Sequence, residues 1–149
     1  MLDFTYYAPT KVHFGKGKQK EVGAIIKGYG FQKIMMQYGK NSIKASGLYD
    51  EVMASLKENE IEVIEMGGVE PNPKVTFVRE AAKLAKANNV EMILAVGGGS
   101  VIDSCKCTAV AAANDCDPWE FNSAQRVADK SLPVGCILTL AAAGSEMSS

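Results

Sequence analysis

Three consecutive glycines stand between an apolar run and a segment of helical character, in the stretch from Ala95 to Asp103. A strand that ends in glycines and opens a helix lets backbone N–H groups approach a phosphate, because no Cβ blocks the way. The helix N-terminus adds about half a positive charge, and a serine hydroxyl there can donate a further hydrogen bond. The pattern therefore predicts an anion site formed by Gly97, Gly98, Gly99 and Ser100.

The glycine run departs from the spaced G-x-G-x-x-G fingerprint of dinucleotide sites, which makes it a weaker signal than that motif. A flexible turn between a strand and a helix would explain the three glycines equally well. Asp103, one turn into the expected helix, is also open to two interpretations. It could stabilise the helix dipole, which is the commoner role, or face a cleft and contact a ribose or amide group.

A second polar segment follows another apolar run and consists of Gly39, Lys40, Asn41 and Ser42. Open α/β sheets bind ligands at the carboxyl ends of their strands, so an adenosine ribose is expected here. An acid at this point would accept a hydrogen bond from the 2′-hydroxyl of NAD, whereas basic and hydroxyl side chains suit a 2′-phosphate. Because the acid is missing, the segment favours NADP(H) over NAD(H); an ordinary polar loop is the alternative.

Asn72 precedes Pro73, and this pair is typical of a helix start, with an N-cap followed by a first-turn proline. The same asparagine could donate a hydrogen bond to a cofactor from the mouth of the preceding strand. The two roles use different atoms, so both remain open.

Other catalytic and metal-binding chemistries lack the residues they need. His13 is the only histidine, and one histidine cannot build a two-His or three-His metal site. Ser145 lies in Gly-Ser-Glu, which is not a nucleophile elbow, and no histidine follows it. The cysteines lack the paired spacing of zinc knuckles, and we expect buried free thiols at Cys105, Cys107, Cys116 and Cys136.

Segments of strand and helical character alternate along the whole chain, which is typical of an α/β domain with a mainly parallel sheet. Core strands are expected over residues 33–38, 61–66, 91–96 and 132–138, and a small antiparallel entry over 4–7 and 11–14. Helices are expected over 19–29, after Ser46, from Asn72 to about residue 85, and over 100–113. The predicted fold is therefore a Rossmann-like sheet flanked by helices, within one domain over residues 1–149.

The formal net charge of −1, with acids and bases interleaved, gives no electrostatic footprint for nucleic acid or an anionic membrane. No apolar run reaches the roughly 18 to 20 residues that span a bilayer. The first residues lack the basic and then apolar pattern of a signal peptide. We therefore expect a cytoplasmic protein. The end at Ser149, shortly after the last expected strand, suggests that a second domain is missing.

Four motifs together resemble the iron-containing (group III) alcohol dehydrogenases, and most of all their butanol dehydrogenase branch. They occur in the order and spacing of that family and cover the whole chain. In the sequence they read PTKVHFGKG from Pro9, PNP from Pro71, GGGSVID from Gly97 and TLAAAGSEM from Thr139.

The resemblance implies an N-terminal α/β dinucleotide domain followed by an all-helical domain, with a divalent metal, Fe or Zn, bound by one aspartate and three histidines of the helical part. It also implies the site residues. The glycine run with Ser100 corresponds to the pyrophosphate loop, Asp103 to a cleft-facing acid, and Gly39 to the position where NAD-using relatives carry an aspartate.

In the same family the segment that contains Thr139, Leu140 and Ala143 corresponds to the strand and turn beside the adenine and the nicotinamide ribose. Many relatives have a threonine where this chain has Ala143. The change removes a hydroxyl, and one neutral hydrogen bond is worth roughly 1 kcal/mol.

The expected activity is reversible hydride transfer between NAD(P)H and an alcohol or aldehyde, with this chain holding the cofactor and catalysing nothing alone. The resemblance also implies a homodimer formed through the early strands. Two alternatives stay open: a non-catalytic nucleotide-binding module, and an enzyme of the glycerol dehydrogenase or dehydroquinate synthase type.

Overall fold

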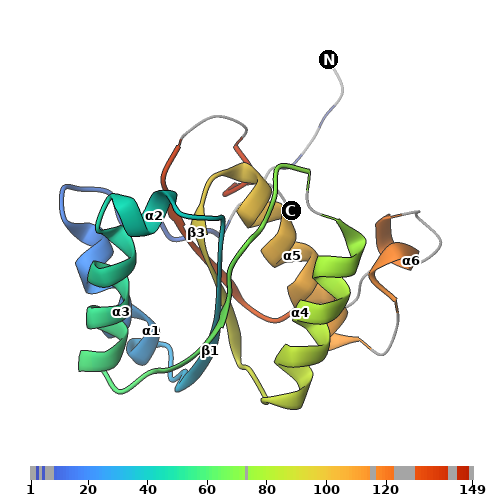
Figure 1. Cartoon of the computed structure of the whole chain (residues 1–149), viewed down its shortest axis with the longest axis horizontal. Helices are drawn as coiled ribbons and strands as arrows, with labels where there is room; N and C mark the ends of the chain where they lie inside the picture. The colour runs from blue at the N-terminus through green and yellow to red at the C-terminus, as the bar shows by residue number, and fades with distance from the viewer. Residues whose placement is uncertain are drawn as a thin grey trace.

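The computed structural model describes residues 3, 5, 9–72, 74–114, 117–122, 130–140 and 144–147, without the side chains of residues 121 and 122. Within these ranges a four-stranded sheet forms the middle of the molecule (Figure 1). Its strands are β1 (Lys33–Tyr38), β2 (Glu62–Met66), β3 (Met92–Gly97) and β4 (Val134–Leu138).

The sheet has the order β2-β1-β3-β4, and all three strand pairings are parallel. A parallel sheet needs a crossover between consecutive strands, and helices provide these crossovers here. The expected α/β fold with a mainly parallel sheet flanked by helices is confirmed.

Alternating side chains of β1 enter two separate apolar cores. Ile34, Met36 and Tyr38 point to the face covered by α1 (Val22–Gly28) and α3 (Leu48–Glu58). Met35 points to the opposite face, which is covered by α4 (Val75–Ala87) and α5 (Gly99–Ala113). Because helices cover both faces, the central strands read as continuous apolar runs (Figure 1).

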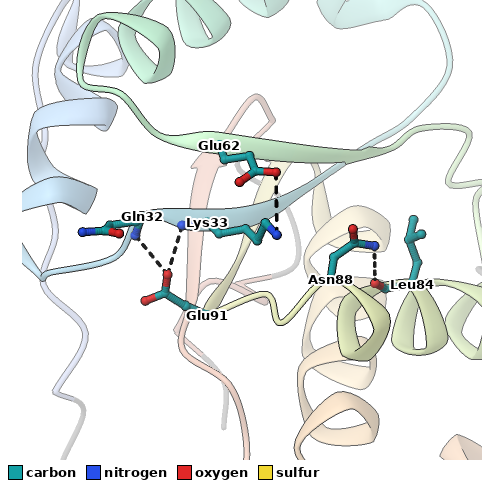
Figure 2. Close-up of polar contacts among 6 residues, drawn as sticks. All are labelled: Gln32, Lys33, Glu62, Leu84, Asn88 and Glu91. Carbon is teal, nitrogen blue, oxygen red and sulfur yellow. Dashed lines mark hydrogen bonds and ion pairs between the residues drawn. The ribbon is translucent and has the colours of Figure 1, made fainter.

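At the amino ends of the strands, a carboxylate caps the start of β1 (Figure 2). Glu91 Oε1 accepts hydrogen bonds from the backbone N–H groups of Gln32 and Lys33, at 3.2 and 3.1 Å. Lys33 Nζ lies 3.6 Å from Glu62 Oε1, so an ion pair also links β1 to β2. On α4, Asn88 Nδ2 donates to the carbonyl of Leu84 at 2.9 Å. Structural polar contacts therefore gather at this edge of the sheet.

The helices α1 and α3 cross very closely at a glycine. The backbone N–H of Gly23 donates to Ser55 Oγ at 2.9 Å. A Cβ on Gly23 would collide with the backbone carbonyl of Ser55 and lie 2.7 Å from Asn59 Nδ2. Only a residue without a side chain fits this crossing.

The expected strand over residues 11–14 is not formed. Residues 11–14, expected as a strand, have no regular secondary structure and are exposed, with Phe14 95% accessible. A lone strand has no partner for its N–H and C=O groups, and none of the described residues pairs with this one. Most of the other entry strand, over 4–7, lies outside the described residues.

The start of α4 also differs from the expectation. Its N-cap is Lys74, in extended conformation and without a side-chain capping bond, so Asn72 does not cap this helix. Asn72 instead takes a left-handed conformation, with φ of 55°, which asparagine tolerates better than most residues.

The helix expected over 19–29 is divided into a 3₁₀ helix, η1 (Lys18–Glu21), and α1. The short helices α2 (Ser42–Ala45) and α6 (Pro118–Asn122) were not predicted. Among the described residues, no helix is both long and apolar enough to cross a membrane. The cytoplasmic location stays a prediction.

The expectation of buried thiols holds only in part. Cys105 is buried and Cys107 partly buried, but Cys136, on β4, is exposed, and Cys116 lies outside the described residues. Burial raises the pKa of the Cys105 thiol well above its ordinary value.

Candidate cofactor-binding site

The topology marks one place at which a ligand is expected to bind, between the loops that follow β1 and β3; we term this place the crevice. The chain passes from β1 outward to β2, and then returns to form β3 on the other side of β1. The crossover through α3 covers one face, and the crossovers through α4 and α5 cover the other. Loops after β1 and β3 therefore diverge at their carboxyl ends, which is the switch point at which open α/β sheets bind ligands.

The glycine turn lies on one side of this crevice. Gly97 ends β3, Gly98 is the N-cap and Gly99 begins α5. A Cβ on Gly97 would lie 2.7 Å from Val101 Cγ2, so internal packing explains this glycine. A Cβ on Gly98 would meet no heavy atom of the described residues within 4 Å, and its φ of −94° is open to any residue. The protein's own structure therefore does not require the second glycine.

The N-terminus of α5 presents free donors at the same place. The first intrahelical bonds run from the N–H groups of Val101 and Ile102 to the carbonyl of Gly98, both at 3.1 Å. The preceding N–H groups of the helix have no intrahelical acceptor, and in the described part of the chain no side chain caps them. A phosphate fits this turn, because no described atom fills the space beside Gly98 and the helix dipole favours an anion.

Asp103 lies on α5 and is exposed, so it does not enter the apolar core beneath the helix. Its negative charge adds to burial in raising the pKa of Cys107, one turn further along. The structure thus leaves the carboxylate accessible, as a cleft-facing role requires. The same exposure suits stabilisation of the helix dipole.

The loop after β1 forms the other side of the crevice. Gly39 follows the strand directly, Lys40 and Asn41 are exposed, and Ser42 begins the short helix α2. The Gly39 carbonyl accepts from the N–H of Gly68 at 3.0 Å, so its lone pair faces the β2 loop. Lys40 Nζ lies 3.7 Å from a carboxylate oxygen of Glu70, an exposed ion pair that only partly neutralises the lysine.

The loop after β4 lies beside the glycine turn. The N–H of Thr139 donates to the carbonyl of Gly97 at 3.0 Å, and Leu140 is 68% exposed. Ala143 lies outside the described residues. Asn72 is exposed in the β2–α4 connection, one strand further from the switch point. The fold therefore brings the Gly97–Ser100, Gly39–Ser42 and Thr139 segments to one edge of the sheet, and places Asn72 at its periphery.

Comparison with known proteins identifies the family to which this sequence is similar. The sequence profile of the iron-containing alcohol dehydrogenases matches residues 9–149. The chain belongs to this family. It is 47% identical over 147 residues to NADH-dependent butanol dehydrogenase A of Clostridium acetobutylicum, which covers 99% of this chain and 38% of that protein. It is 38% identical over 149 residues to the NADPH-dependent aldehyde reductase YqhD of Escherichia coli, covering 98% of this chain and 38% of the reductase.

Solved structures agree with the assignment to the iron-containing alcohol dehydrogenases. The NADH-dependent butanol dehydrogenase A of Thermotoga maritima superposes with a TM-score of 0.93 at 42% identity, over 95% of this chain and 36% of that one. The match to the butanol dehydrogenases confirms the branch expected from the sequence motifs. The chain spans well under half the length of each of these relatives.

The family name implies iron, and the described residues offer no place to bind it. They contain no group of three or more His, Cys, Asp or Glu side chains that could hold a metal ion.

Sequence reasoning missed one cluster at the carboxyl ends of β1 and β2. The hydroxyls of Tyr38 and Tyr49 both donate to Glu65 Oε1, at 3.1 and 2.7 Å. Lys44 Nζ lies over both rings, 5.5 and 5.0 Å from their centroids. Since Lys44 belongs to α2, this cluster anchors the helix that ends the Gly39–Ser42 loop. In the sequence, Tyr38 at the end of a predicted strand was the feature that could have indicated this cluster.

Proposed function

We propose that this chain is the nicotinamide-cofactor domain, over residues 1–149, of an NAD(P)-dependent oxidoreductase that interconverts alcohols and aldehydes. The observation that carries the proposal is Gly98, whose missing side chain leaves open space in front of unpaired helix donors at the switch point. The family, and relatives named butanol dehydrogenase and aldehyde reductase, support the reaction class.

The contribution of this chain is positioning. When bound, the nicotinamide carries a hydride to or from the substrate carbon. Donors from Gly98, Gly99 and Ser100 would hold the pyrophosphate, while Thr139, Leu140 and Ala143 would lie beside the sugars and bases. Asp103 and Asn72 would add side-chain contacts from the edges of the crevice. A fixed pyrophosphate determines where the nicotinamide ring lies, and misplacement of a reacting group is costly.

The proposed cofactor preference is NADP(H) over NAD(H). Position 39 is a glycine, which leaves room for a 2′-phosphate, and Lys40, Asn41 and Ser42 supply a cation and polar donors. Relatives named for NADH and for NADPH both occur, so the proposed preference rests on the local residues alone. The substrate class is a small alcohol or aldehyde, and the metal, Fe or Zn, would be held outside this chain. Homodimer formation stays a prediction.

Calorimetric titration of the chain with NADPH and with NADH tests the proposal. We expect both to bind, NADPH more tightly, and Gly98→Val to weaken both by at least about tenfold, or about 1.4 kcal/mol. The matched control is Gly28→Val, because Gly28 also has open space around its Cβ site but lies at the end of α1. Equal binding by wild type and Gly98→Val would remove the glycine turn as the phosphate site.

The proposed preference for NADPH over NADH is tested by a second variant, Gly39→Asp, in the same titration. Gly39→Asp fits the structure, because a Cβ there meets only the Val69 carbonyl at an ordinary 3.6 Å. The new carboxylate should repel a 2′-phosphate and accept from a 2′-hydroxyl, so the preference should reverse toward NADH. An unchanged ratio of the two Kd values would mean that the 2′-position does not lie at this loop.

A further inference from the structure

An amide side chain lies in the middle of the apolar core. Gln37 is fully buried on the central strand β1, two residues before Gly39. It points to the face covered by α4 and α5, where Ser104 and Thr108 of α5 are equally inaccessible. Most of the core on that face is formed by aliphatic side chains and alanines.

The three side chains form a directional hydrogen-bond network. Ser104 Oγ donates to Gln37 Oε1 at 2.9 Å, and Gln37 Nε2 donates to Thr108 Oγ1 at 2.9 Å. The Thr108 hydroxyl in turn donates to the backbone carbonyl of Ser104 at 2.8 Å. Gln37 Nε2 also lies 3.7 Å from the sulfur of Met35. Each hydroxyl proton and the amide oxygen therefore have partners.

Stability alone does not explain this network. Replacing buried polar partners together by apolar groups of similar shape is often neutral or stabilising. Apolar packing, however, tolerates small sliding or rotation of a helix, whereas an amide with fixed hydroxyl partners is satisfied in only one arrangement. The network therefore defines the position of α5 along and around its axis relative to β1.

The place of the network connects it to the cofactor crevice. Gln37 pairs in register with Ala95 of β3. Gln37 is two residues before Gly39, which follows β1, and Ala95 is two residues before Gly97, which ends β3. Ser104 is on the second turn of the helix that begins at Gly99. The network thus joins, through the core, the strand that leads to one side of the crevice and the helix that forms the other.

We propose that Gln37, Ser104 and Thr108 are positioning residues that hold the N-terminus of α5 where it binds the cofactor pyrophosphate. The inference rests on the proposed function. Because NADPH and NADH carry the same pyrophosphate, loss of the network should weaken both cofactors by the same factor. The NADPH preference, which belongs to the Gly39–Ser42 loop, should not change.

The test is the triple variant Gln37→Met, Ser104→Ala, Thr108→Val, compared with wild type by calorimetry and thermal unfolding. We expect its midpoint of unfolding to equal or exceed that of wild type, while Kd for NADPH and for NADH both rise about tenfold. Cofactor affinity equal to that of wild type, in a variant that unfolds at or above the wild-type midpoint, would overturn the inference. If wild type binds neither cofactor, the proposed function fails, and this inference fails with it.

Two single variants keep the test decisive if the triple variant folds poorly. Thr108→Ser retains the hydroxyl that accepts from Gln37 and donates to Ser104, so cofactor affinity should stay within about twofold of wild type. Thr108→Val has a similar shape but lacks the hydroxyl, so affinity for both cofactors should fall. Equal affinities for these two variants would show that packing, not the network, matters.

Discussion

At the scale of single residues, two adjacent glycines are present for different reasons. Gly97 has no side chain because Val101 occupies the space, whereas no atom of the described residues fills the space beside Gly98. Gly28 is equally open, at the end of α1, so the openness of Gly98 is informative because it coincides with the uncapped start of α5. The contrast between these neighbours is the strongest local argument for a ligand at the start of α5.

Tyr49 offers a pH-dependent prediction at the same scale. The hydrogen bond to Glu65, with burial and the negative charge adding to it, raises the pKa of Tyr49 from 10 to about 12. The folded state thus favours the neutral phenol. The resulting stability is fully present below pH 10 and is lost as the pH rises toward about 12, because the unfolded chain ionises first.

Ultraviolet titration of the phenolate checks this value. We expect Glu65→Gln to lower the pKa of Tyr49 toward 10, with Tyr49→Phe identifying which part of the curve belongs to this residue. The pKa of Tyr38 is raised chiefly by burial, so it should respond less to the same substitution. A titration curve that does not change in Glu65→Gln would contradict the shared hydrogen bonds.

Residue types alone predicted the glycine turn and the loop after β1, because backbone freedom and charge are local properties. They could not reveal the role of Gln37, whose partner Thr108 lies 71 residues away in sequence. Residues 33–38 are predicted simply as a strand, and nothing in that prediction distinguishes this amide. Lys44 was missed for the same reason, since its position over two rings depends on how α2 and α3 pack.

At the scale of elements, the crossing of α1 and α3 gives a prediction about stability. Gly23→Ala should reduce the free energy of unfolding by about 1–3 kcal/mol or more, because its Cβ would meet the backbone of Ser55, which cannot rotate away. Gly28→Ala, in the same helix with open space around it, should instead stabilise by roughly 0.4–1 kcal/mol. Urea unfolding of both variants measures the difference.

A Gly23→Ala variant as stable as wild type would show that the helices can separate at little cost. That result would also question the hydrogen bond from Gly23 to Ser55. Equal effects of the two alanines would indicate that helix propensity, rather than contact between helices, decides stability at these positions.

The elements themselves were predictable where apolar periodicity was strong. The four core strands and the helices that contain Val52 and Val78 begin or end within a few residues of the expected positions. The strand expected over 11–14 failed because alternation of Val12 and Phe14 needs a partner strand to bury one face. Pro73 suggested a helix start at Asn72, but α4 begins at Val75, after an extended Lys74.

At the scale of the whole molecule, we expect cofactor binding without catalytic turnover. We predict that the purified 149-residue chain binds NADPH but shows no alcohol-dependent reduction of NADP⁺, even with added Fe(II) or Zn(II). The reason is chemical: the chain has a single histidine, His13, and its described residues contain no metal-binding group. A spectrophotometric assay of NADPH formation is the measurement, and measurable turnover would contradict the prediction.

The strand order has a further consequence for how the chain folds as it is synthesised. β1 is central, but its partners arrive late: Ile34 pairs with Val63, 29 residues on (63 − 34), and with Met92, 58 residues on (92 − 34). At the roughly 5–20 residues per second of translation, the edge of β1 that will bind β3 stays open for roughly 3–12 s. During that interval the nascent chain exposes an apolar strand edge, and a chaperone that holds it would prevent aggregation.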